Sequence, residues 1–426
     1  MFELPFEIDQ VLEKLCHSGY EAYLVGGAVR DMLMDKPAHD YDVTTSATPE
    51  ETERVFEGYK VIKTGIRHGT VTVLVGNYPV EITTFRREGS YTDGRHPDAV
   101  FFSRRLEDDL SRRDLTVNAV AYSPVKGLSD PFGGVDDIKN RIIRCVGDPD
   151  ERFSEDHLRL LRALRFSAVL GFAIERGTAE SIHKNAELIR TVSAERVFSE
   201  LCRLVCGDGA RMILEEYRDV ITAVIPELSA LDGDDYAHTV GSLSYTEPFL
   251  HLRLAALLHD TVAAPSGRDD VCVIRDTAAK NALARLRCPT ALCDNVCRII
   301  RYCGSDVDPS DKISLKRLAS KTGIKILKDV IKLKRADVLA GDPRLYHRLT
   351  DLNTAYDTLC ETEENGTALD VRDLAINGND VKGLGVRPGP AVGELLRYAL
   401  DGVISDRVEN EKAPLLAYVA EKISGV

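Results

Sequence analysis

The sequence lacks any apolar run near the ~18 residues that a membrane-spanning helix needs. Its first residues, MFELPFEIDQVLEKL, include acidic side chains and show no signal-peptide pattern. None of the ten cysteines forms a CxxC pair; Cys202/Cys206 and Cys293/Cys297 are spaced by four residues without a His or Cys partner pattern, which favours reduced thiols in helices over zinc ligands. We therefore expect a cytoplasmic protein with no membrane partner.

Positive charge is also in deficit, with 55 Lys and Arg against 68 Asp and Glu and a formal net charge of −13. This balance argues against a protein that coats nucleic acid nonspecifically. A nucleic-acid substrate would instead need local basic strips, and two exist, at 86–113 and 312–335. The second strip is equally compatible with a solvated helix face.

The 426 residues are too many for one core and predict two to four domains. Residues 1–145 read as mixed α/β, with a helix over 8–18, a buried strand at 23–25 and a hairpin that joins 70–75 to 80–85 at Gly76-Asn77. Thr48-Pro49-Glu50-Glu51 has the form of a helix start with a capping box. From about residue 150 onward nearly every segment has helical periodicity.

Two aspartates stand at alternate positions in the strand-like run His39-Asp40-Tyr41-Asp42-Val43-Thr44-Thr45. Alternate residues of a strand point to the same side, so Asp40 and Asp42 would face one cation. Glu81 lies on a predicted neighbouring strand and could be a third carboxylate. Carboxylates with substrate phosphates suit one or two Mg²⁺ ions, which bind the attacking and leaving oxygens of a phosphoryl transfer. A DxD pair alone is weak evidence, because an exposed strand face often carries one by chance.

A glycine pair precedes these aspartates in Leu24-Val25-Gly26-Gly27-Ala28-Val29-Arg30-Asp31, which reads as strand, turn and helix. Glycine lets a phosphate approach the backbone, and a helix N-terminus offers free N–H groups. Arg30, about one turn into the helix, could reach the same anion. A plain tight turn with Arg30 on the surface is the alternative.

These residues resemble the first motif of the nucleotidyltransferase superfamily that includes DNA polymerase β. More narrowly, the sequence is similar to the class II tRNA nucleotidyltransferases, which are CCA-adding enzymes, and to the bacterial poly(A) polymerases. Four further motifs follow in the family's order: RRDLTVNA at 112–119, DPFGG at 130–134, EDHLRLLRALRF at 155–166 and SAERV at 193–197. The match covers about residues 20–205.

The resemblance implies an α+β fold, with a polymerase-β-like head of mixed sheet and helices followed by an all-α remainder. The expected parts are a catalytic head (1–145), a helical neck that serves as nucleotide-base template (146–206), a helical body with a degenerate HD-like remnant (207–335) and a helical tail that binds tRNA (336–426). The tail would grip the tRNA elbow by shape and phosphate contacts.

The segment 155–169 is amphipathic, with Asp156, Arg159, Arg162 and Arg165 along one side. Such a pattern usually means a basic solvated face. The resemblance implies instead that Asp156 and Arg159 read the base, because cytosine and adenine both pair an amino donor with a ring-nitrogen acceptor. Arg162 and Arg165 would steady this template or reach the triphosphate.

The resemblance carries further site assignments. Gly26 and Gly27 form the phosphate cradle, and Gly27, Arg30 and Arg113 would contact the incoming nucleotide. The Gly-rich loop at 87–98, which otherwise reads as a surface loop, corresponds to a loop that the family needs to switch from C to A, and CC-only enzymes lack part of it. Its apparent completeness favours full CCA addition.

His259-Asp260, with His238 upstream, resembles part of an HD metal-hydrolase core. The usual continuation after His-Asp is absent, and no convincing final Asp is found, so a degenerate remnant is expected.

The predicted reaction is attack of the tRNA 3′-hydroxyl on the α-phosphate of CTP or ATP with release of pyrophosphate, supported by Mg²⁺ on Asp40 and Asp42. Three alternatives stay open. They are poly(A) polymerase or partial CC- or A-adding activity, an HD-type phosphohydrolase whose head is a relic, and a non-catalytic tRNA-binding protein.

Overall fold

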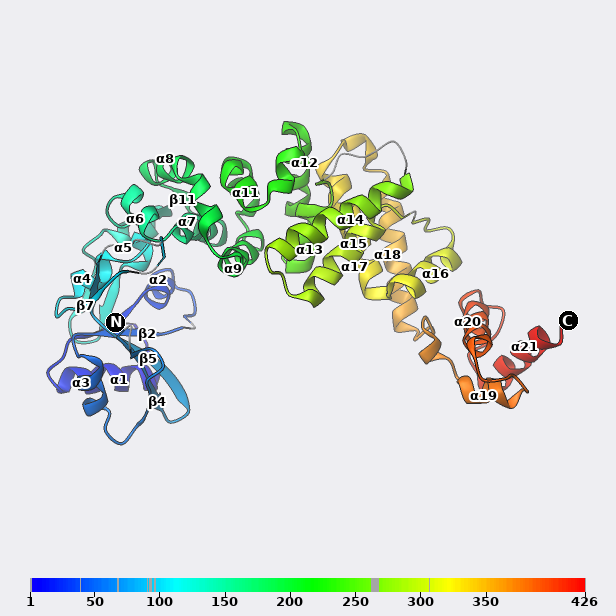
Figure 1. Ribbon diagram of the computed structural model, residues 1–426, viewed down its shortest axis with the longest axis horizontal. Coiled ribbons are helices and arrows are strands. Elements are labelled where there is room, and N and C mark those ends of the chain that lie inside the picture. The colour runs from blue at the N-terminus through cyan, green and yellow to red at the C-terminus, as the bar shows by residue number, and fades with distance from the viewer. Residues whose placement is uncertain are drawn as a thin grey trace. The chain divides into compact units, whose positions relative to one another are not determined.

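The computed structural model describes residues 2–38, 40–66, 69–89, 91, 94–95, 97–261, 268–305 and 307–425, with the side chains of 268–273 left out. The chain divides into two compact units, Met1–Pro226 and Glu227–Val426 (Figure 1). The first holds every strand of the described chain, and the second is helical throughout its described residues. The α/β start followed by a helical remainder is therefore confirmed, while the finer division into four parts stays a prediction.

A seven-stranded mixed sheet organises the first unit, in the order β3-β4-β5-β2-β1-β8-β9. Only the pairing of β2 with β5 is parallel within this sheet. The strands are β1 Ala22–Val25, β2 Asp42–Thr45, β3 Lys60–Ile62, β4 Thr70–Val75, β5 Tyr78–Thr84, β8 Ala121–Ser123 and β9 Gly127–Ser129. Two small sheets pair β6 Arg86–Glu88 with β7 Val100–Phe102, and β10 Ile142–Ile143 with β11 Ala173–Ile174.

Both faces of the sheet are buried at β1, which explains its unbroken apolar sequence. Leu24 packs with α1 (Phe6–His17) in one core cluster, whereas Tyr23 and Val25 pack in another with α4 (Leu106–Ser111). This alternation follows from the two-residue period of a strand. The sheet is therefore held between helices, and its strand ends are left to carry polar side chains.

Local signals in the head have the expected structural consequences. Thr48 caps α3 (Pro49–Val55) in a full capping box with Glu51. Gly76 and Asn77 form a two-residue hairpin turn between β4 and β5, and Gly76 has φ +61°, as such a turn requires. The strand expected from residue 39 is shorter, because β1 ends at Val25 and leaves residues before Asp42 without a partner. His39 lies outside the described residues.

The other helices of the first unit follow the sheet region along the chain. The apolar side expected for 155–169 is confirmed, since Leu160, Leu161, Leu164 and Ala168 are fully buried. These helices are α2 Gly27–Leu33, α5 Gly134–Asn140, α6 Pro149–Glu155, α7 Leu158–Leu170, α8 Arg176–Lys184, α9 Ala194–Val205, α10 Ala210–Glu216 and α11 Arg218–Val224.

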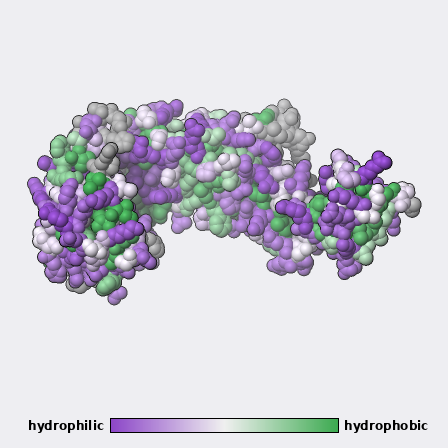
Figure 2. Space-filling model, turned by 60° about the horizontal axis from the view of Figure 1, so that its bottom comes forward, coloured by the Kyte–Doolittle hydropathy of each residue, from purple (hydrophilic) through white to green (hydrophobic). Residues whose placement is uncertain are grey.

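Ten α-helices are described in the second unit, and α19–α21 have an apolar core cluster of their own. None of the helices described in the chain combines the length and apolarity that crossing a bilayer requires. The face in Figure 2 shows hydrophilic side chains interspersed with hydrophobic ones. The helices are α12 Gly233–Ser244, α13 Leu250–Leu258, α14 Arg268–Arg285, α15 Thr290–Cys303, α16 Lys312–Thr322, α17 Ile324–Ala340, α18 Arg348–Glu364, α19 Gly378–Gly383, α20 Pro390–Ile404 and α21 Lys412–Ser424.

The basic strip 312–335 lies on α16 and α17 and is largely paired inside the second unit. Exposed ion pairs stabilise a protein by only about 0.2–1 kcal/mol, so a phosphate can replace the carboxylate at small cost. The strip is therefore not a bare solvated face. Its pairs are Lys312–Glu361, Lys316–Asp406, Arg317–Asp401, Lys328–Glu363 and Lys332–Glu247.

Candidate active site

Three carboxylates lie near one another at one end of the central strands. Asp42 is the first residue of β2 and lies opposite Glu81 of β5 in the parallel register. Asp40 precedes it by two residues, and both aspartates are exposed while Tyr41 between them packs partly against the core. Asp42 interacts electrostatically with both Asp40 and Glu81, so the three carboxylates lie near one another, while their common orientation toward one cation stays a prediction.

The electrostatics of this group favour a bound cation. Partial burial, which removes water from the carboxylate, raises the pKa of Asp42. The positive charge of Arg113 lowers this pKa, and the negative charges of Glu81 and Asp40 raise it. The net shift is upward, although the side chain keeps an exposed surface. A carboxylate held near two others is stabilised when a divalent ion takes up the surplus negative charge.

Arg113 brings positive charge to the glycine turn next to these carboxylates. Gly26 follows β1 and precedes α2 with φ +75° and ψ −137°, and a Cβ atom there would lie 3.2 Å from Arg113 Nη1. Arg113 has only long hydrogen bonds, 3.4 Å to the Asn118 carbonyl oxygen and 3.4 Å to Asp109 Oδ2, and its buried Nε has no hydrogen-bond partner among the described residues. This guanidinium can therefore bind an anion that enters over the glycine turn.

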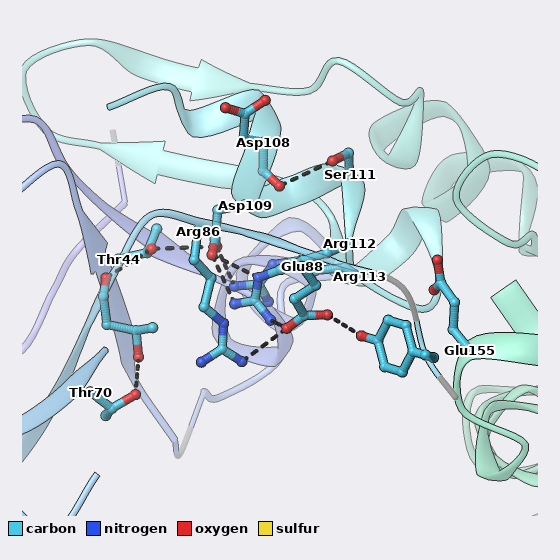
Figure 3. Close-up of polar contacts among 12 residues, drawn as sticks. Thr44, Thr70, Arg86, Glu88, Asp108, Asp109, Ser111, Arg112, Arg113 and Glu155 are labelled. Atoms are coloured by element: carbon cyan, nitrogen blue, oxygen red, sulfur yellow. Dashed lines mark hydrogen bonds and ion pairs between the residues drawn. The ribbon is translucent and has the colours of Figure 1, made fainter. Parts of the chain in front are cut away.

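Asp109 ties this cluster to the rest of the site (Figure 3). Its fully buried carboxylate accepts bonds from Arg112 at 2.8 and 3.0 Å, and lies 3.4 Å from Arg113 Nη2 and from Thr44 Oγ1 on β2. Burial raises the pKa of the Asp109 carboxyl, but Arg112 and Arg113 outweigh burial and hold that pKa below its usual value. Asp109 thus stays ionised and fixes both arginines relative to β2.

Arg30 is buried, and its guanidinium is turned toward protein groups. Nη1 donates to Asn118 Oδ1 at 2.8 Å, and Nε and Nη2 donate to Asp31 Oδ1 at 2.9 and 2.7 Å. The surface position that was the alternative for Arg30 is therefore wrong. A Cβ atom at Gly27 would lie 3.6 Å from Arg30 Nη2, so the arginine covers the second glycine.

A buried chain of polar contacts runs from Arg30 to the neck helices. Asn118 contacts Asp114 at 3.4 Å, and Asp114 Oδ2 accepts from Arg162 Nε at 2.8 Å. Burial raises the pKa of the Asp114 carboxyl, yet Arg162 holds it below its usual value. Since Asp114 follows Arg113 directly, this chain joins the anion-binding arginine of the head to α7.

Asp156 lies before α7 and not on it, which corrects the continuous helix expected over 155–169. α6 ends at Glu155, Asp156 has extended backbone angles, and its Oδ1 accepts from Leu158 N at 3.2 Å, which starts the new helix. Its Oδ2 accepts from Arg196 Nη2 at 2.7 Å. The carboxylate is thus held from two directions with its remaining lone pairs available.

Arg159 is in the first turn of α7 and is held by Glu155, by the Arg152 carbonyl at 3.3 Å and by the Arg112 carbonyl at 3.1 Å. These bonds use three of the five N–H donors that a guanidinium has. The basic solvated face that the pattern usually means is wrong here, because Arg159 and Arg165 are both buried.

Asp156 and Arg159 line one cavity of about 500 Å³ together with the described part of the loop at 87–98. Ser90, Thr92, Asp93 and His96 of that loop lie outside the described residues. Glu88 in this cavity pairs with Arg86 at 3.1 Å and Arg112 at 3.0 Å, and accepts a bond from Tyr91 (Figure 3). The structure therefore brings the expected base-reading pair and the expected switching loop to one space.

Glu200 of α9 neutralises the remaining two arginines of the pattern. Its carboxylate accepts from Arg165 Nε at 2.8 Å and lies 3.6 Å from Arg162 Nη1. The Arg165 guanidinium also stacks 3.5 Å from the centre of the Phe166 ring. Burial lowers the pKa of Arg165, and Glu200 opposes that effect. These contacts favour a role in steadying the template.

Sequence reasoning missed four residues that hold this site: Asp109, Asp114, Arg196 and Glu200. Asp114 and Arg196 lie inside the motifs 112–119 and 193–197, but the motifs did not show that they bind Arg162 and Asp156. Asp109 is the last of three consecutive acids and Glu200 is a single acid in a helical segment, and no local pattern separates either from surface acids.

Comparison with known families covers most of the chain. Residues 22–144 match the model of the poly A polymerase head domain, and residues 171–231 match the "probable RNA and SrmB- binding site of polymerase A". Residues 271–419 match the model of domain 2 of tRNA nucleotidyltransferases.

Whole-length relatives carry one name. The chain is 37% identical over 414 residues to the CCA-adding enzyme of Lactobacillus helveticus, covering 96% of each chain. It is 33% identical to that of Streptococcus gordonii, covering 98% of each. Among solved structures, the Bacillus stearothermophilus CCA-adding enzyme in complex with CTP is 30% identical, with a TM-score of 0.77 over 100% of this chain and 99% of that one.

Proposed function

Because the chain belongs to the family of CCA-adding enzymes, we propose that it adds C, C and A to the 3′ end of tRNA from CTP and ATP. The 3′-oxygen forms a bond to the α-phosphorus, the bond from that phosphorus to the bridging oxygen breaks, and pyrophosphate leaves. The hydroxyl proton passes to solvent. The observation that carries the proposal is the meeting of Asp42 with Glu81 beside Arg113 at the glycine turn.

Asp40 and Asp42, with Glu81 beside them, would hold the divalent cation that this chemistry uses, and we assign it as Mg²⁺. All three are oxygen ligands on one side of the sheet, and Mg²⁺ prefers such ligands together with substrate phosphates. When bound, Mg²⁺ neutralises charge that develops on the attacking and leaving oxygens. The Asp42 carboxyl, whose pKa is raised without a cation, has the charge surplus that such an ion would offset.

The triphosphate is assigned to the glycine turn. Neither Gly26 nor Gly27 has a side chain that would hinder a phosphate, and Arg113 lies against Gly26 with an Nε that has no hydrogen-bond partner among the described residues. Arg30 covers Gly27 and completes the cradle from the helix. A planar guanidinium suits phosphate oxygens because it donates two parallel hydrogen bonds.

Base choice is assigned to Asp156 and Arg159. A carboxylate accepts from the amino group of cytosine or adenine, and a guanidinium donates to the adjacent ring nitrogen. Guanine and uracil present a carbonyl beside an N–H, so both contacts would be lost. Arg162 and Arg165 would hold this template through Asp114 and Glu200.

The neck (146–206), body (207–335) and tail (336–426) would present the tRNA, with the tail at its elbow. A tRNA substrate places the reaction in the cytoplasm. The paired cations of α16 and α17 are suitable contacts, since phosphates can take over weak exposed ion pairs.

The decisive experiment incubates purified protein with tRNA that ends at the discriminator base. CTP alone should extend it by two nucleotides, and CTP with ATP by three, after which extension stops. Asp42→Asn should abolish extension, whereas Asp136→Asn, an exposed carboxylate on α5, should leave it unchanged. A product that grows by repeated AMP addition without CTP would show a poly(A) polymerase and overturn the proposal.

A further inference from the structure

A second group of potential metal ligands lies in the helical unit, far along the chain from the head carboxylates. His238 of α12, His259 and Asp260 just after α13, and Asp337 of α17 place one ligand atom each within 4.8 Å of all the others. Sequence reasoning found the first three and no final Asp. Asp337 supplies it 77 residues after Asp260, within the periodic sequence of another helix.

The spacing of these atoms fits a single central ion. Asp337 Oδ1 lies 2.9 Å from His238 Nε2 and 3.2 Å from His259 Nε2. Asp260 Oδ2 lies 3.8 Å from His238 Nε2 and 3.1 Å from His259 Nε2. Ligands that each stand ~2.0–2.2 Å from a metal are about 3–4 Å from one another, which matches these separations.

The orientation of His259 points to the same conclusion. Its Nδ1 lies 2.8 Å from the Ala256 carbonyl oxygen, which can only accept, so Nδ1 carries a proton. Its Nε2 therefore faces the two carboxylates, and either a proton on that nitrogen or a metal ion between the ligands satisfies this arrangement. A backbone carbonyl behind an imidazole is also the usual support of a metal-bound histidine.

The group is closed on one side and open on the other. His259 is buried and Asp337 is the most exposed of the four, with 40% of its side chain accessible. Asp260 is fixed by Arg275, whose Nη2 lies 2.7 Å from Asp260 Oδ1 and so leaves Oδ2 for the cluster.

From this geometry we propose that the second unit binds one first-row divalent transition-metal ion, such as Mn²⁺, through His238, His259, Asp260 and Asp337. Two imidazoles select against Mg²⁺, which prefers oxygen ligands, so this site differs in metal preference from the head. The expectation of a degenerate remnant rested on the absent usual continuation after His-Asp and on a missing final Asp, and Asp337 removes the second of these reasons.

The test uses the full chain with Asp40→Asn and Asp42→Asn, so that the head does not compete for metal. After chelation and gel filtration, Mn²⁺ is titrated while electron paramagnetic resonance reports the free ion. Mn²⁺ is the probe because cysteine thiolates prefer softer ions such as Zn²⁺. We expect one bound Mn²⁺ per chain that excess Mg²⁺ does not displace.

Added to this background, Asp337→Ala and His238→Gln should each weaken Mn²⁺ binding by at least about 100-fold, more than the loss of a supporting residue costs. His238 is partly exposed, so this variant tests ligation even if Asp337→Ala fails to fold. The matched control is His251→Gln. Its Nε2 pairs with Asp329 at 3.1 Å between the same helices α13 and α17, outside the cluster.

Mn²⁺ should also raise the unfolding temperature of the background chain and of the His251→Gln control, but not of the two cluster variants. Equal Mn²⁺ binding in the background chain and in His238→Gln would overturn the proposal. So would the absence of stoichiometric Mn²⁺ binding, which would leave the cluster as a protonated histidine held between two carboxylates.

Discussion

Replacing Gly26 by alanine is expected to damage both the fold and nucleotide binding, while the same change at Gly27 should spare the fold. Gly26 has φ +75° with ψ −137°, a backbone region that essentially only glycine adopts. Its Cβ would also lie 3.2 Å from Arg113 Nη1. Gly27 has ordinary helical geometry at the start of α2, and its Cβ would meet Arg30 Nη2 at 3.6 Å, a normal contact.

The backbone strain of Gly26→Ala costs on the order of 1–3 kcal/mol. For a unit of this size, about 2 kcal/mol corresponds to a fall of roughly 4–8 °C in the unfolding temperature. Arg113 must also move by a few tenths of an ångström, and its two 3.4 Å hydrogen bonds are too long to resist. The arginine should therefore leave its position over the turn, and the KM for CTP should rise.

The assay compares both variants with the parent chain by thermal unfolding and by single-nucleotide addition of CMP to tRNA. Gly27→Ala should unfold within a degree or so of the parent, because alanine is favourable in a helix. It should still raise the KM for CTP if a phosphate approaches this turn. Equal unfolding temperatures for the two variants would refute the strain argument, and an unchanged KM in both would refute the phosphate cradle.

Three further predictions follow from the contacts of the site. Arg196→Met should free the Asp156 carboxylate and lower the preference for CTP over UTP by about tenfold or more, because a bidentate base contact contributes about 1–3 kcal/mol. The preference is measured as the ratio of the two kcat/KM values, and an unchanged ratio would contradict the template role. Glu200→Ala should lower the free energy of unfolding by about 3–5 kcal/mol in denaturant titration, because buried guanidinium groups lose their counter-charge, and Glu200→Gln should cost less. Asp42→Asn should stabilise the metal-free chain at neutral pH. Because the folded-state pKa of Asp42 is raised, the free energy of unfolding falls as the pH rises through that pKa and the carboxyl becomes charged. Asparagine removes this charge. Thermal unfolding without metal, with Asp136→Asn as control, checks the sign.

Features set by neighbouring residues could be predicted from the sequence. The capping box at Thr48, the hairpin at Gly76 and the apolar side of α7 each depend on a few consecutive positions, and the structure confirms them. The placement of Asp42 beside Glu81 was expected only as a possibility. Their strands pair directly although 39 residues separate Asp42 from Glu81. β2 and β5 are the one parallel pair of the main sheet, and no local pattern in the sequence identifies such a pairing.

Features set by distant partners could not be predicted in the same way. Four polar residues at three-residue steps predicted one continuous helix face. This spacing did not show that Asp156 precedes the helix, because the break depends on the Asp156 side chain, which accepts a hydrogen bond from Leu158 N. Nor did it show that Arg159 and Arg165 are buried. Charge alone suggests that these arginines are exposed. Their burial is stabilised by acids from α6 and α9, which neutralise the guanidinium charges.

Burying those arginines has a consequence for base selection. A template that discriminates by about 1–3 kcal/mol per contact works only if its carboxylate cannot turn to suit the wrong base. An exposed Asp–Arg pair is held by less than that amount, so it would adapt to uracil or guanine as easily as it would reject them. Here Asp156 is fixed by Arg196 and by a backbone N–H, and Arg159 by an acid and two carbonyls, in surroundings where unpaired polar groups are costly. On the proposed assignment of base choice, the rigidity of the pair, more than its chemistry, would let two side chains take the place of a nucleic-acid template.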